Sequence, residues 1–362
     1  MPSIIFTVTN DIVYDQRMLR ICNSLDNAGY AVTIVGRKLK RSVNLRNESF
    51  KQKRIKCFFE KGKLFYIEFN IRLFFYLLRE KTDAICAIDL DTIVPCYLIS
   101  RLKKVKRIYD AHELFCEMKE IVSRPPIYKI WKIIEKITVP KFKYGYTVNE
   151  PIAKEFEKMY NVHYEVIRSI AVYDATMRDV EKEKFILYQG AVNEGRCFET
   201  LIPAMQWVDS KLIICGTGNF MKQAKELVKK HHLEEKVIFK RMLPPDQLRS
   251  YTQKSYIGIT LFEKDSLSNY YSLANRFFDY IQAATPQLCV DYPVYQELNK
   301  MYPVGVLISD LSSESIAANL NKLLTDESLW KQIHESCKVA RKELNWQKEE
   351  EKLLNFYKNI FG

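Results

Sequence analysis

Two kinds of apolar pattern alternate along the whole chain. Short runs rich in β-branched and aromatic residues, beginning with Ser3–Thr9, are separated by longer stretches in which apolar positions recur every three or four residues. The short runs are typical of buried parallel strands, and the longer stretches are typical of helices that cover a sheet. The sequence therefore predicts an α/β protein with doubly wound parallel sheets.

The first half of the chain reads as one such sheet. After the first strand, a helix is expected over Gln16–Asn27, ending near Gly29. Its inward face is expected to carry Met18, Leu19, Cys22 and Leu25. Further strands are expected at Ala31–Val35, Ala84–Ile88, Arg107–Tyr109 and Tyr144–Val148.

A polar, charged stretch at 171–184 interrupts this pattern, and a strand at Phe185–Gln189 opens a second alternating run. We therefore expect an N-terminal domain over 1–170, a linker over 171–184, a C-terminal domain over 185–345 and a last helix over 346–362. The second run continues with strands at Lys211–Cys215, Val237–Lys240, Tyr256–Thr260, Gln287–Val290 and Val304–Ile308, and the chain closes with helices at Glu327–Glu343 and Trp346–Phe361.

The net charge of +12 is unevenly distributed. Residues 1–170 hold 31 lysines and arginines against 19 acidic residues, whereas residues 171–362 hold 25 of each. Within the first half, Arg37–Lys63 carries eleven basic residues and two acidic ones. Such a field attracts anionic lipid surfaces, lipid-phosphate acceptors or nucleic acid, and a solvated basic surface is the alternative.

Cysteine usage and hydropathy narrow the class of protein. The nine cysteines are scattered without paired spacing, which predicts reduced thiols and a cytoplasmic location. No metal-ligand spacing is present, so no metal site is expected. No apolar run reaches the ~18 residues needed to span a bilayer. The first residues read as a strand and not as a signal peptide.

The stretch Ser266–Asp291 combines a polar loop, a short helix and a buried strand. The helix is expected to begin near Leu273, and the free N–H groups of a first turn stabilise an anion. One turn further on, the carboxylate of Asp279 can accept hydrogen bonds from sugar hydroxyls. An ordinary core helix with a solvated aspartate is the alternative. The loop holds Asn269, Tyr270, Tyr271 and Ser272, and the inward helix face holds Phe277, Tyr280 and Ile281.

The string SLANRFFDYIQAATP within this stretch resembles the SLPNKLFEYMAAGLP-type segment of retaining family 4 glycosyltransferases of the GT-B fold. The resemblance covers nearly the full chain. It implies two Rossmann-like domains facing across a cleft, an acceptor-binding first domain, a nucleotide-sugar-binding second domain and a last helix that crosses back. It also implies that Asp279 holds the donor ribose, while Tyr271 stands where the family has its other acid. The remaining donor-side residues of this stretch are Ser272, Leu273, Asn275 and Arg276.

Two glycine-containing loops follow strands of the second domain. In QGAVNEGR, Gly190 gives the backbone freedom to approach a pyrophosphate, and Arg196 is placed to neutralise it. Arg196 occupies the position of a family lysine, whereas Ala191 replaces a family arginine, for which Arg276 is a candidate substitute. In CGTGN, Gly216 and Gly218 resemble a nucleotide-pocket turn of the same family. A lone GxG is weak support for a dinucleotide site.

Two polar clusters follow strands of the first domain. The YDAHE string places His112 and Glu113 after a strand, and its resemblance to bacterial relatives implies that His112 lies near the transferred sugar. A structural histidine is the alternative. In the NDIVYDQR string, Asp15 and Arg17 are candidates to contact the acceptor or to brace the loop.

Two aromatic and basic stretches, Leu64–Arg79 and Ile127–Phe142, have the composition of helices that lie on a membrane surface. Their apolar spacing also fits ordinary core stripes, and core packing is the favoured interpretation. The Arg37–Lys63 segment is therefore the preferred candidate for contact with an anionic membrane. The residues assigned to the core are Phe74, Leu77, Leu78, Ile130, Ile133, Ile134 and Ile137.

These observations together predict a metal-independent glycosyltransferase that needs no cofactor. The resemblance implies that it moves a sugar, with retention, from a nucleotide-diphosphate sugar to a glycan or lipid-linked acceptor in bacterial cell-surface polysaccharide synthesis. His112 and Arg196 are the candidate catalytic residues. A UDP-sugar epimerase and a non-catalytic nucleotide-binding relative are the alternatives. Nucleic acid is not expected as a partner, because no nucleic-acid-binding motif is present.

Overall fold

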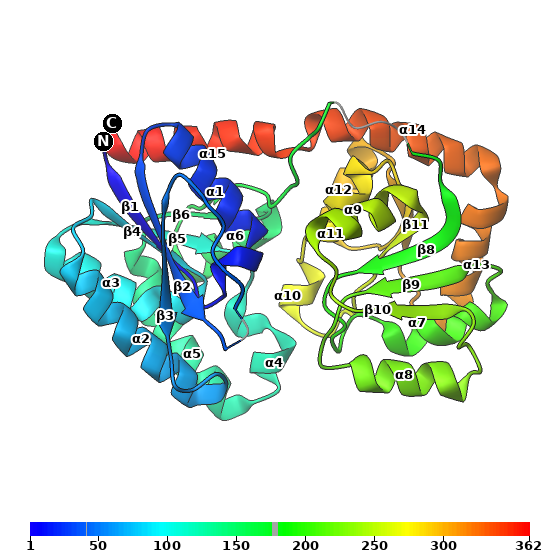
Figure 1. The fold of residues 1–362 in the computed structure, drawn as a ribbon, viewed down its shortest axis with the longest axis horizontal. Coiled ribbons are helices and arrows are strands. Elements are labelled where there is room, and N and C mark those ends of the chain that lie inside the picture. The colour runs from blue at the N-terminus through cyan, green and yellow to red at the C-terminus, as the bar shows by residue number, and fades with distance from the viewer. Residues whose placement is uncertain (41, 176–179) are drawn as a thin grey trace. The chain divides into compact units, whose positions relative to one another are not determined.

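The computed structural model describes residues 1–40, 42–175 and 180–362, which form two compact units (Figure 1). The N-terminal unit comprises Met1–Ser169 together with Glu349–Gly362, and the C-terminal unit comprises Ile170–Lys348. Residues 176–179 of the expected linker and Arg41 of the expected basic segment lie outside the described residues.

The N-terminal unit is built on a seven-stranded parallel sheet with the order β3-β2-β1-β4-β5-β6-β7. The chain steps from β1 outward to β3 and then returns to the other side of β1 with β4. Ligands of doubly wound sheets bind at the carboxyl ends of the strands where this order reverses. The strands are β1 Ser3–Thr7, β2 Ala31–Lys38, β3 Lys51–Lys56, β4 Ala84–Ile88, β5 Lys106–Ala111, β6 Tyr144–Thr147 and β7 Glu165–Val166.

Helices cover both faces of this sheet. On one face α3 lies against α2 on one side and α5 on the other (Figure 1). The helices of this unit are α1 Gln16–Asn27, α2 Gly62–Arg79, α3 Ile93–Lys103, α4 Lys119–Val122, α5 Pro125–Thr138, α6 Glu150–Tyr160 and, for its last thirteen residues, α15 Trp346–Phe361, with short 3-10 helices at Ile12–Tyr14, Leu90–Thr92, Phe115–Glu117 and Val139–Lys141.

The last helix of the chain packs on the N-terminal unit, as predicted. Tyr357 of α15 is fully buried, and its ring lies 6.2 Å from that of Phe6 in β1. The Tyr357 hydroxyl lies 3.3 Å from that of Tyr146 in β6. The Lys106 ammonium donates to the carbonyl of Ile360. These contacts come from three strands, β1, β5 and β6, and hold α15 on the sheet.

The C-terminal unit is built on a six-stranded parallel sheet with the order β10-β9-β8-β11-β12-β13. Its strand order reverses between β8 and β11. The strands are β8 Glu183–Gln189, β9 Lys211–Cys215, β10 Val237–Lys240, β11 Ser255–Thr260, β12 Gln287–Val290 and β13 Gly305–Ile308. The helices are α7 Phe198–Ala204, α8 Met221–Lys230, α9 Pro245–Lys254, α10 Leu267–Tyr270, α11 Asn275–Gln282, α12 Pro293–Met301, α13 Ser313–Thr325 and α14 Glu327–Glu343, with a 3-10 helix at Met205–Trp207.

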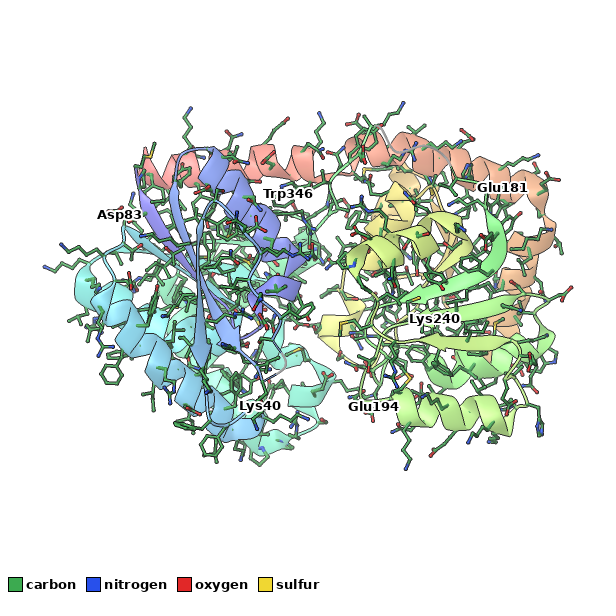
Figure 2. All side chains as sticks on the ribbon, viewed as in Figure 1. Lys40, Asp83, Glu181, Glu194, Lys240 and Trp346 are labelled. Atoms are coloured by element: carbon green, nitrogen blue, oxygen red, sulfur yellow. The ribbon has the colours of Figure 1, made fainter. Side chains whose placement is uncertain are left out.

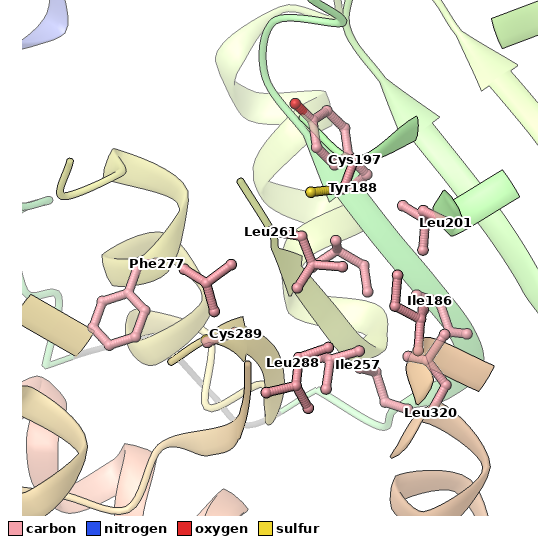
Figure 3. Close-up of a cluster of buried hydrophobic side chains, with 14 of the residues drawn as sticks. Ile186, Tyr188, Cys197, Leu201, Ile257, Leu261, Phe277, Leu288, Cys289 and Leu320 are labelled. Carbon is pink, nitrogen blue, oxygen red and sulfur yellow. The ribbon is translucent and has the colours of Figure 1, made fainter. Parts of the chain in front are cut away.

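The core of the C-terminal unit explains why these strands form. Figure 3 shows Ile186 of β8, Ile257 of β11 and Leu288 of β12 among its side chains, and all three are fully buried. Helices on the sheet bury further apolar residues, including Phe277 of α11 and Leu320 of α13. Because helices cover both faces of this parallel sheet, its strands consist of continuous apolar runs and not of alternating apolar and polar residues.

The predicted architecture is confirmed, with two strands added. The expected strands and the helix at Gln16–Asn27 form, and that helix buries the four residues assigned to its inner face. The strands β3 and β7 were not predicted. The strand β3 pairs only with β2 at the edge of the sheet, and Ile55 is its only buried residue, so it lacks an apolar run.

The expected helix near Leu273 begins later, and a separate short helix precedes it. The hydroxyl of Ser266 accepts from the backbone N–H of Asn269 at 3.1 Å and caps α10 within the stretch predicted as a loop. The helix α11 begins at Asn275, because Ala274 is extended and donates its N–H to the Tyr295 hydroxyl at 3.1 Å. The bond that caps the start of α10 and the bond that delays α11 therefore replace the predicted loop and helix start with two helices.

The assignment of both amphipathic stretches to the core is wrong in part. In α5, the side chains of Ile130, Ile133 and Ile137 are exposed. In α2, Leu78 is exposed, whereas Leu77 is buried. The apolar spacing was recognised correctly, but these faces have no covering element among the described residues.

Candidate active site

The two glycine loops of the C-terminal unit pack against each other. The N–H of Gly190 donates to the carbonyl of Cys215 at 3.0 Å, at the carboxyl ends of β8 and β9. A Cβ on Gly216, whose φ is +155°, would lie 1.8 Å from the Gly190 carbonyl oxygen. Only glycine therefore fits at position 216, because any side chain would separate the two loops.

The same argument accounts for Gly218. A Cβ there would lie 2.2 Å from the carbonyl oxygen of Val192. The loops are further joined by Asn193, whose side-chain oxygen accepts from the N–H of Asn219, and by Asn219, whose side-chain oxygen accepts from the N–H of Glu194, each at 3.1 Å. The predicted glycine positions are thus used for loop-to-loop packing, which holds the backbone at this end of the sheet in one shape.

Arg276 lies at the reversal of strand order in the C-terminal unit. Its Nη1 donates to the carbonyl of Gln189 at the end of β8, and its Nη2 donates to the carbonyl of Leu261 just after β11, both at 3.4 Å. Nη1 also donates to the Tyr188 hydroxyl at 3.1 Å. The side chain is buried, and among the described residues its Nε–H has no acceptor. A buried donor of this kind costs about 1–3 kcal/mol unless something satisfies it.

A second guanidinium lies near the first. The Arg276 guanidinium carbon is 4.5 Å from the centre of the Phe262 ring, and that of Arg196 is 4.6 Å from the same ring. Arg196 also donates from Nη1 to the side-chain oxygen of Asn269 in α10 at 3.2 Å. Arg196 is only partly buried. The structure therefore brings together two cations that the sequence placed on separate elements.

Asp279 belongs to the same group of residues. Its carboxylate accepts from the side-chain amide of Gln189 at 2.8 Å, and the Gln189 oxygen accepts from the Thr252 hydroxyl at 2.7 Å. Gln189 and Thr252 are buried, whereas Asp279 is partly exposed. The amide orients the carboxylate and leaves part of it accessible from outside.

The start of α11 supplies the remaining donor-side candidates. Asn275, the first residue of the helix, is exposed, and Leu273 and Ser272 precede it in partly buried positions. The Ser272 hydroxyl donates to the carbonyl of Asn269 at 2.8 Å, which ties this segment to α10. The N–H of Ala274 is already used by Tyr295, so the N–H groups of Asn275 and Arg276 are those left to the first turn.

A hollow of about 480 Å³ opens beside Gly216, which the resemblance assigns to a nucleotide-pocket turn, but the lining residues at the end of β10 were not predicted. It lies beyond the carboxyl ends of β9 and β10. Lys240, the last residue of β10 and labelled in Figure 2, was the available signal, because polar residues at that end of a strand face ligands. The hollow is lined by Gly216, Thr217, Met221, Lys225, Phe239, Lys240, Arg241 and Met242.

In the N-terminal unit, His112 lies between two carboxylates after β5. Its Nε2 is 3.1 Å from Oδ2 of Asp110, and its Nδ1 is 3.4 Å from Oδ2 of Asp89. Its backbone N–H donates to Oδ1 of Asp89 at 2.9 Å. Burial alone would lower the pKa of His112, but Asp110 and Asp89 raise it to about 9. The two carboxylates therefore favour the imidazolium form at neutral pH, whereas Arg17, whose Nε lies 3.1 Å from Nε2, opposes it. A quarter of the side chain is exposed.

Arg17 completes this cluster from the side of the first helix. Its guanidinium donates to Asp110 through Nη2 at 2.9 Å and Nε at 3.3 Å, and Nη1 donates to the carbonyl of Ile167 at 2.9 Å. Burial would raise the pKa of Asp110, but Arg17 and His112 lower it. Arg17 and Asp110 are both buried. This geometry favours bracing over acceptor contact for Arg17.

The other two acceptor-side candidates flank this cluster. Asp15 caps α1, because its carboxylate accepts from the N–H of Met18 at 3.0 Å. Glu113 follows His112 and is partly exposed.

Two aspartates at the end of β4 were not singled out from the sequence. Asp89 has a φ of +54°, which a non-glycine residue rarely adopts. Asp91 accepts a 2.5 Å hydrogen bond from the hydroxyl of Thr9, and burial together with Asp89 raises its pKa to about 7. The AIDLD string contained the signal, since carboxylates after a buried strand lie at the ligand-binding edge of the sheet.

The raised pKa of His112 makes the stability of the N-terminal unit depend on pH. The folded pKa of about 9 lies above the ordinary value of 6.5, so the stabilisation is complete below pH 6.5 and is lost as the pH rises through 9. We expect the His112→Gln variant to have a lower free energy of unfolding than the unchanged protein. The difference should be about 2 kcal/mol at pH 6, after allowance for solvent screening, and much smaller at pH 10.

Urea unfolding at the two pH values measures this difference. The exposed His163 provides a control, because His163→Gln is expected to leave the free energy of unfolding unchanged at both. A difference for His112→Gln that is equal at pH 6 and pH 10 would contradict a charged His112.

The comparisons with known proteins bear on both units. Residues 174–339, which make up most of the C-terminal unit, match the family model described as Glycosyl transferases group 1. A search of curated protein sequences finds no match. The family match therefore covers the unit that holds Arg196, Arg276 and Asp279.

Solved structures resemble the whole chain. Sucrose-phosphate synthase from Thermosynechococcus elongatus has a TM-score of 0.80 at 14% identity and covers 100% of this chain and 99% of its own. WaaG, a glycosyltransferase involved in lipopolysaccharide biosynthesis, has a TM-score of 0.74 at 13% identity, with 96% and 98% covered. HepE of Anabaena in complex with UDP-glucose has a TM-score of 0.74 at 10% identity, with 99% and 100% covered. These likenesses show the fold of the chain, which is GT-B.

Proposed function

We propose that this GT-B chain, whose C-terminal unit carries a glycosyl transferases group 1 domain, moves a sugar from a nucleotide-diphosphate sugar to a glycan or lipid-linked acceptor. The observation that carries the proposal is the group formed by Arg196, Arg276 and Asp279 at the carboxyl ends of β8 and β11. Two guanidiniums and one carboxylate match the diphosphate and the ribose of such a donor. Anabaena HepE, which shares this fold, was solved in complex with UDP-glucose.

The two cations are assigned to the diphosphate. Arg196 is partly exposed and presents a planar fork of donors suited to phosphate oxygens. The buried Nε–H of Arg276, which has no acceptor among the described residues, would be satisfied by an anionic oxygen. The free N–H groups at the start of α11 add to this attraction. In this role Arg276 takes the place of the arginine that the family has at Ala191.

The rest of the nucleotide is assigned to the neighbouring residues. The carboxylate of Asp279, held by Gln189, would accept hydrogen bonds from the ribose hydroxyls. The hollow beside Gly216 has a volume of about 480 Å³, within the range of small-molecule sites, and would take the base.

The N-terminal unit is assigned to the acceptor and to orientation of the sugar. His112 is held as an imidazolium by two carboxylates, so it donates hydrogen bonds and does not act as a general base. Its exposed edge would orient the transferred sugar. Glu113 and Asp15 remain candidates for acceptor contact. The inferred activity belongs to cell-surface polysaccharide synthesis at the cytoplasmic side of the membrane.

The reaction is proposed to proceed with retention and without a metal ion. Catalysis would rest on holding the donor and acceptor together and on stabilising the departing diphosphate with Arg196, Arg276 and the start of α11. In this arrangement, negative charge would develop on the departing diphosphate next to the positively charged side chains of Arg196 and Arg276. Retention is the outcome for a same-face substitution in which no side chain forms a covalent intermediate.

A panel of nucleotide sugars tests the proposal by thermal denaturation. A donor present at one hundred times its dissociation constant is expected to stabilise the protein by about 2.7 kcal/mol, whereas free sugars are expected to have no effect. Asp279→Ala should remove most of this shift. The exposed Asp209 offers a matched control, because Asp209→Ala should keep the full shift.

The stabilising donor is then incubated with and without acceptor glycans. Sugar transfer to an acceptor supports the proposal, and the anomeric configuration of the product tests retention. Conversion of the donor sugar without an acceptor would identify an epimerase instead. If no nucleotide sugar raises the melting temperature, the proposed donor site is rejected.

A further inference from the structure

The helix α2 is apolar on two opposite faces. Its inner face, made of Phe65, Phe69, Leu73 and Leu77, is buried against the unit. Its outer face carries five apolar side chains at every third or fourth position, each between 39% and 56% exposed. A helix that is apolar all round is normally buried, so this outer face is unusual for one in contact with water. The five residues are Leu64, Ile67, Ile71, Phe75 and Leu78.

The exposed apolar face extends onto the neighbouring helices. On the same face of the sheet, α3 exposes Leu98 and Leu102, and the side chains of α5 that proved exposed continue the pattern. The rings of Tyr66 and Trp131 lie 5.8 Å apart and join α2 to α5. Figure 2 shows side chains projecting outward along the length of α2. We call these ten residues the outer apolar surface: Leu64, Ile67, Ile71, Phe75, Leu78, Leu98, Leu102, Ile130, Ile133 and Ile137.

Positive charge surrounds this surface. The three helices carry eight lysines and arginines and only two acidic residues. Both acids are paired, Glu68 with Arg72 at 2.8 Å and Glu135 with Lys132 at 2.8 Å. The other six cations have no carboxylate partner among the described residues, and they are Lys63, Arg79, Arg101, Lys103, Lys129 and Lys136.

A basic hollow lies beside α5. Its volume is about 530 Å³, and its lining includes Lys132, Lys136 and Lys158. Lys132 is paired with Glu135 and Glu117, and Lys158 lies 3.8 Å from Glu155. Lys136 is therefore the lining cation left for the phosphate of a lipid headgroup at the edge of the apolar surface. The cations and the apolar side chains thus lie next to each other, as they do in helices that bind at a membrane interface.

We propose that the outer apolar surface docks on an anionic lipid bilayer, with its isoleucines and leucines inserted at the headgroup boundary and the surrounding cations on lipid phosphates. A second copy of this chain fits the surface poorly, because two identical faces would bring six unpaired cations of each copy together. Spanning is not the mode of contact, since none of the described helices is long and apolar enough to cross a bilayer.

This assignment centres the membrane contact on α2, α3 and α5, and from the Arg37–Lys63 segment favoured by the sequence it retains only Lys63. The guanidinium of Arg37 lies 4.3 Å from the centre of the Phe65 ring and donates to the carbonyl of Glu60. Arg54 pairs with the buried Asp11 at 3.4 Å. These two cations serve the fold. The six cations around the outer apolar surface have no carboxylate partner among the described residues, although Lys103 donates to the carbonyl of Glu80.

Co-sedimentation of the full chain with vesicles tests the proposal and does not depend on the enzymatic activity. One set of vesicles mixes phosphatidylglycerol with phosphatidylcholine, and the other contains phosphatidylcholine alone. We expect binding to the first set, weak binding to the second, and loss of binding in high salt. The double variant Ile71→Gln with Ile133→Gln should bind about tenfold more weakly, because two apolar side chains no longer insert. Its melting temperature should stay unchanged, since both side chains are exposed in the folded protein.

Two further variants separate the apolar and the electrostatic contributions. Lys129→Gln is expected to weaken binding to anionic vesicles about fivefold, the effect of one cation near a charged surface, and to leave binding to neutral vesicles unchanged. The matched control is Trp207→Gln with Val339→Gln, which removes two equally exposed apolar side chains from the C-terminal unit and should bind as the unchanged protein does.

Two outcomes would overturn the proposal. One is a protein that stays in the supernatant with both kinds of vesicle. The other is a stable dimer in solution, measured by light scattering, that Ile71→Gln with Ile133→Gln converts to monomers, because a second copy would then cover this surface. Neither outcome affects the proposed transferase activity, which is measured without vesicles.

Discussion

Replacement of Arg196 by alanine is expected to lower the turnover of a nucleotide-sugar donor by about two orders of magnitude, the scale of losing one contact to a developing anion. The partly exposed Arg196 guanidinium is fixed by Asn269 and by the ring of Phe262, so it is positioned before the donor binds. Because the contact strengthens as charge develops on the leaving diphosphate, the loss should fall mainly on kcat and less on KM. Steady-state kinetics with the stabilising donor measure both constants.

Two further variants test whether a loss of activity in Arg196→Ala comes from the missing guanidinium at this position. Arg196→Lys keeps the charge but not the planar fork of donors, so it should recover part of the activity. Arg249→Ala removes an exposed arginine of the same unit and should keep full activity. A correctly folded Arg196→Ala protein with near-normal kcat would reject the assignment of Arg196 to the leaving group.

The strands and the amphipathic helices could be predicted because their patterns are local. The fully buried strand Ala84–Ile88 and the helix Gln16–Asn27 have the observed bounds. By contrast, β3 has the sequence KQKRIK and is held by backbone pairing with β2, which leaves little trace in the side chains. Edge strands of this kind depend on a neighbour and not on their own apolar content.

The candidate site could be predicted as a set of residues but not as a geometry. Arg276 was recognised only as a candidate cation. Its approach to the ends of β8 and β11 depends on the orientation of α11, which the Tyr295–Ala274 hydrogen bond helps to set across twenty-one residues. The glycine loops were expected to let the backbone approach a pyrophosphate, which stays a prediction, and the structure adds that Gly216 leaves room for the Gly190 carbonyl. Both facts concern pairs of segments that a single sequence does not bring together.

The outer face of α2 shows a further limit of pattern reading. Apolar residues occupy both faces of this helix, and periodicity alone does not tell which face has a neighbour. The same spacing fits a core stripe and a membrane-facing stripe. Only the fold shows that Phe69 lies inside the unit while Ile71 faces outward. The sequence therefore predicted the amphipathic character of this region correctly and its burial only in part, since Leu77 is buried and Leu78 is exposed.

Replacement of Arg17 by methionine is expected to destabilise the protein by about 3–5 kcal/mol, because it leaves the fully buried carboxylate of Asp110 without its main partner. Methionine fills most of the volume, so the loss reports on charge and not on a cavity. Urea unfolding of the full chain measures this free energy.

The double variant Arg17→Met with Asp110→Leu separates the burial of a charge from the loss of a bond. It removes both charges and should recover much of the stability, since a buried pair replaced by apolar residues is often neutral. Arg101→Met, at an exposed position, should have no effect.

The pKa of Asp110 is lowered in the folded state, so the contribution of the pair is present above the ordinary aspartate pKa and is lost as the pH falls through the folded value. The difference in free energy of unfolding between the unchanged protein and Arg17→Met should accordingly shrink in acid. A difference that stays constant down to pH 3 would show that the Arg17–Asp110 pair does not stabilise the fold through its charge.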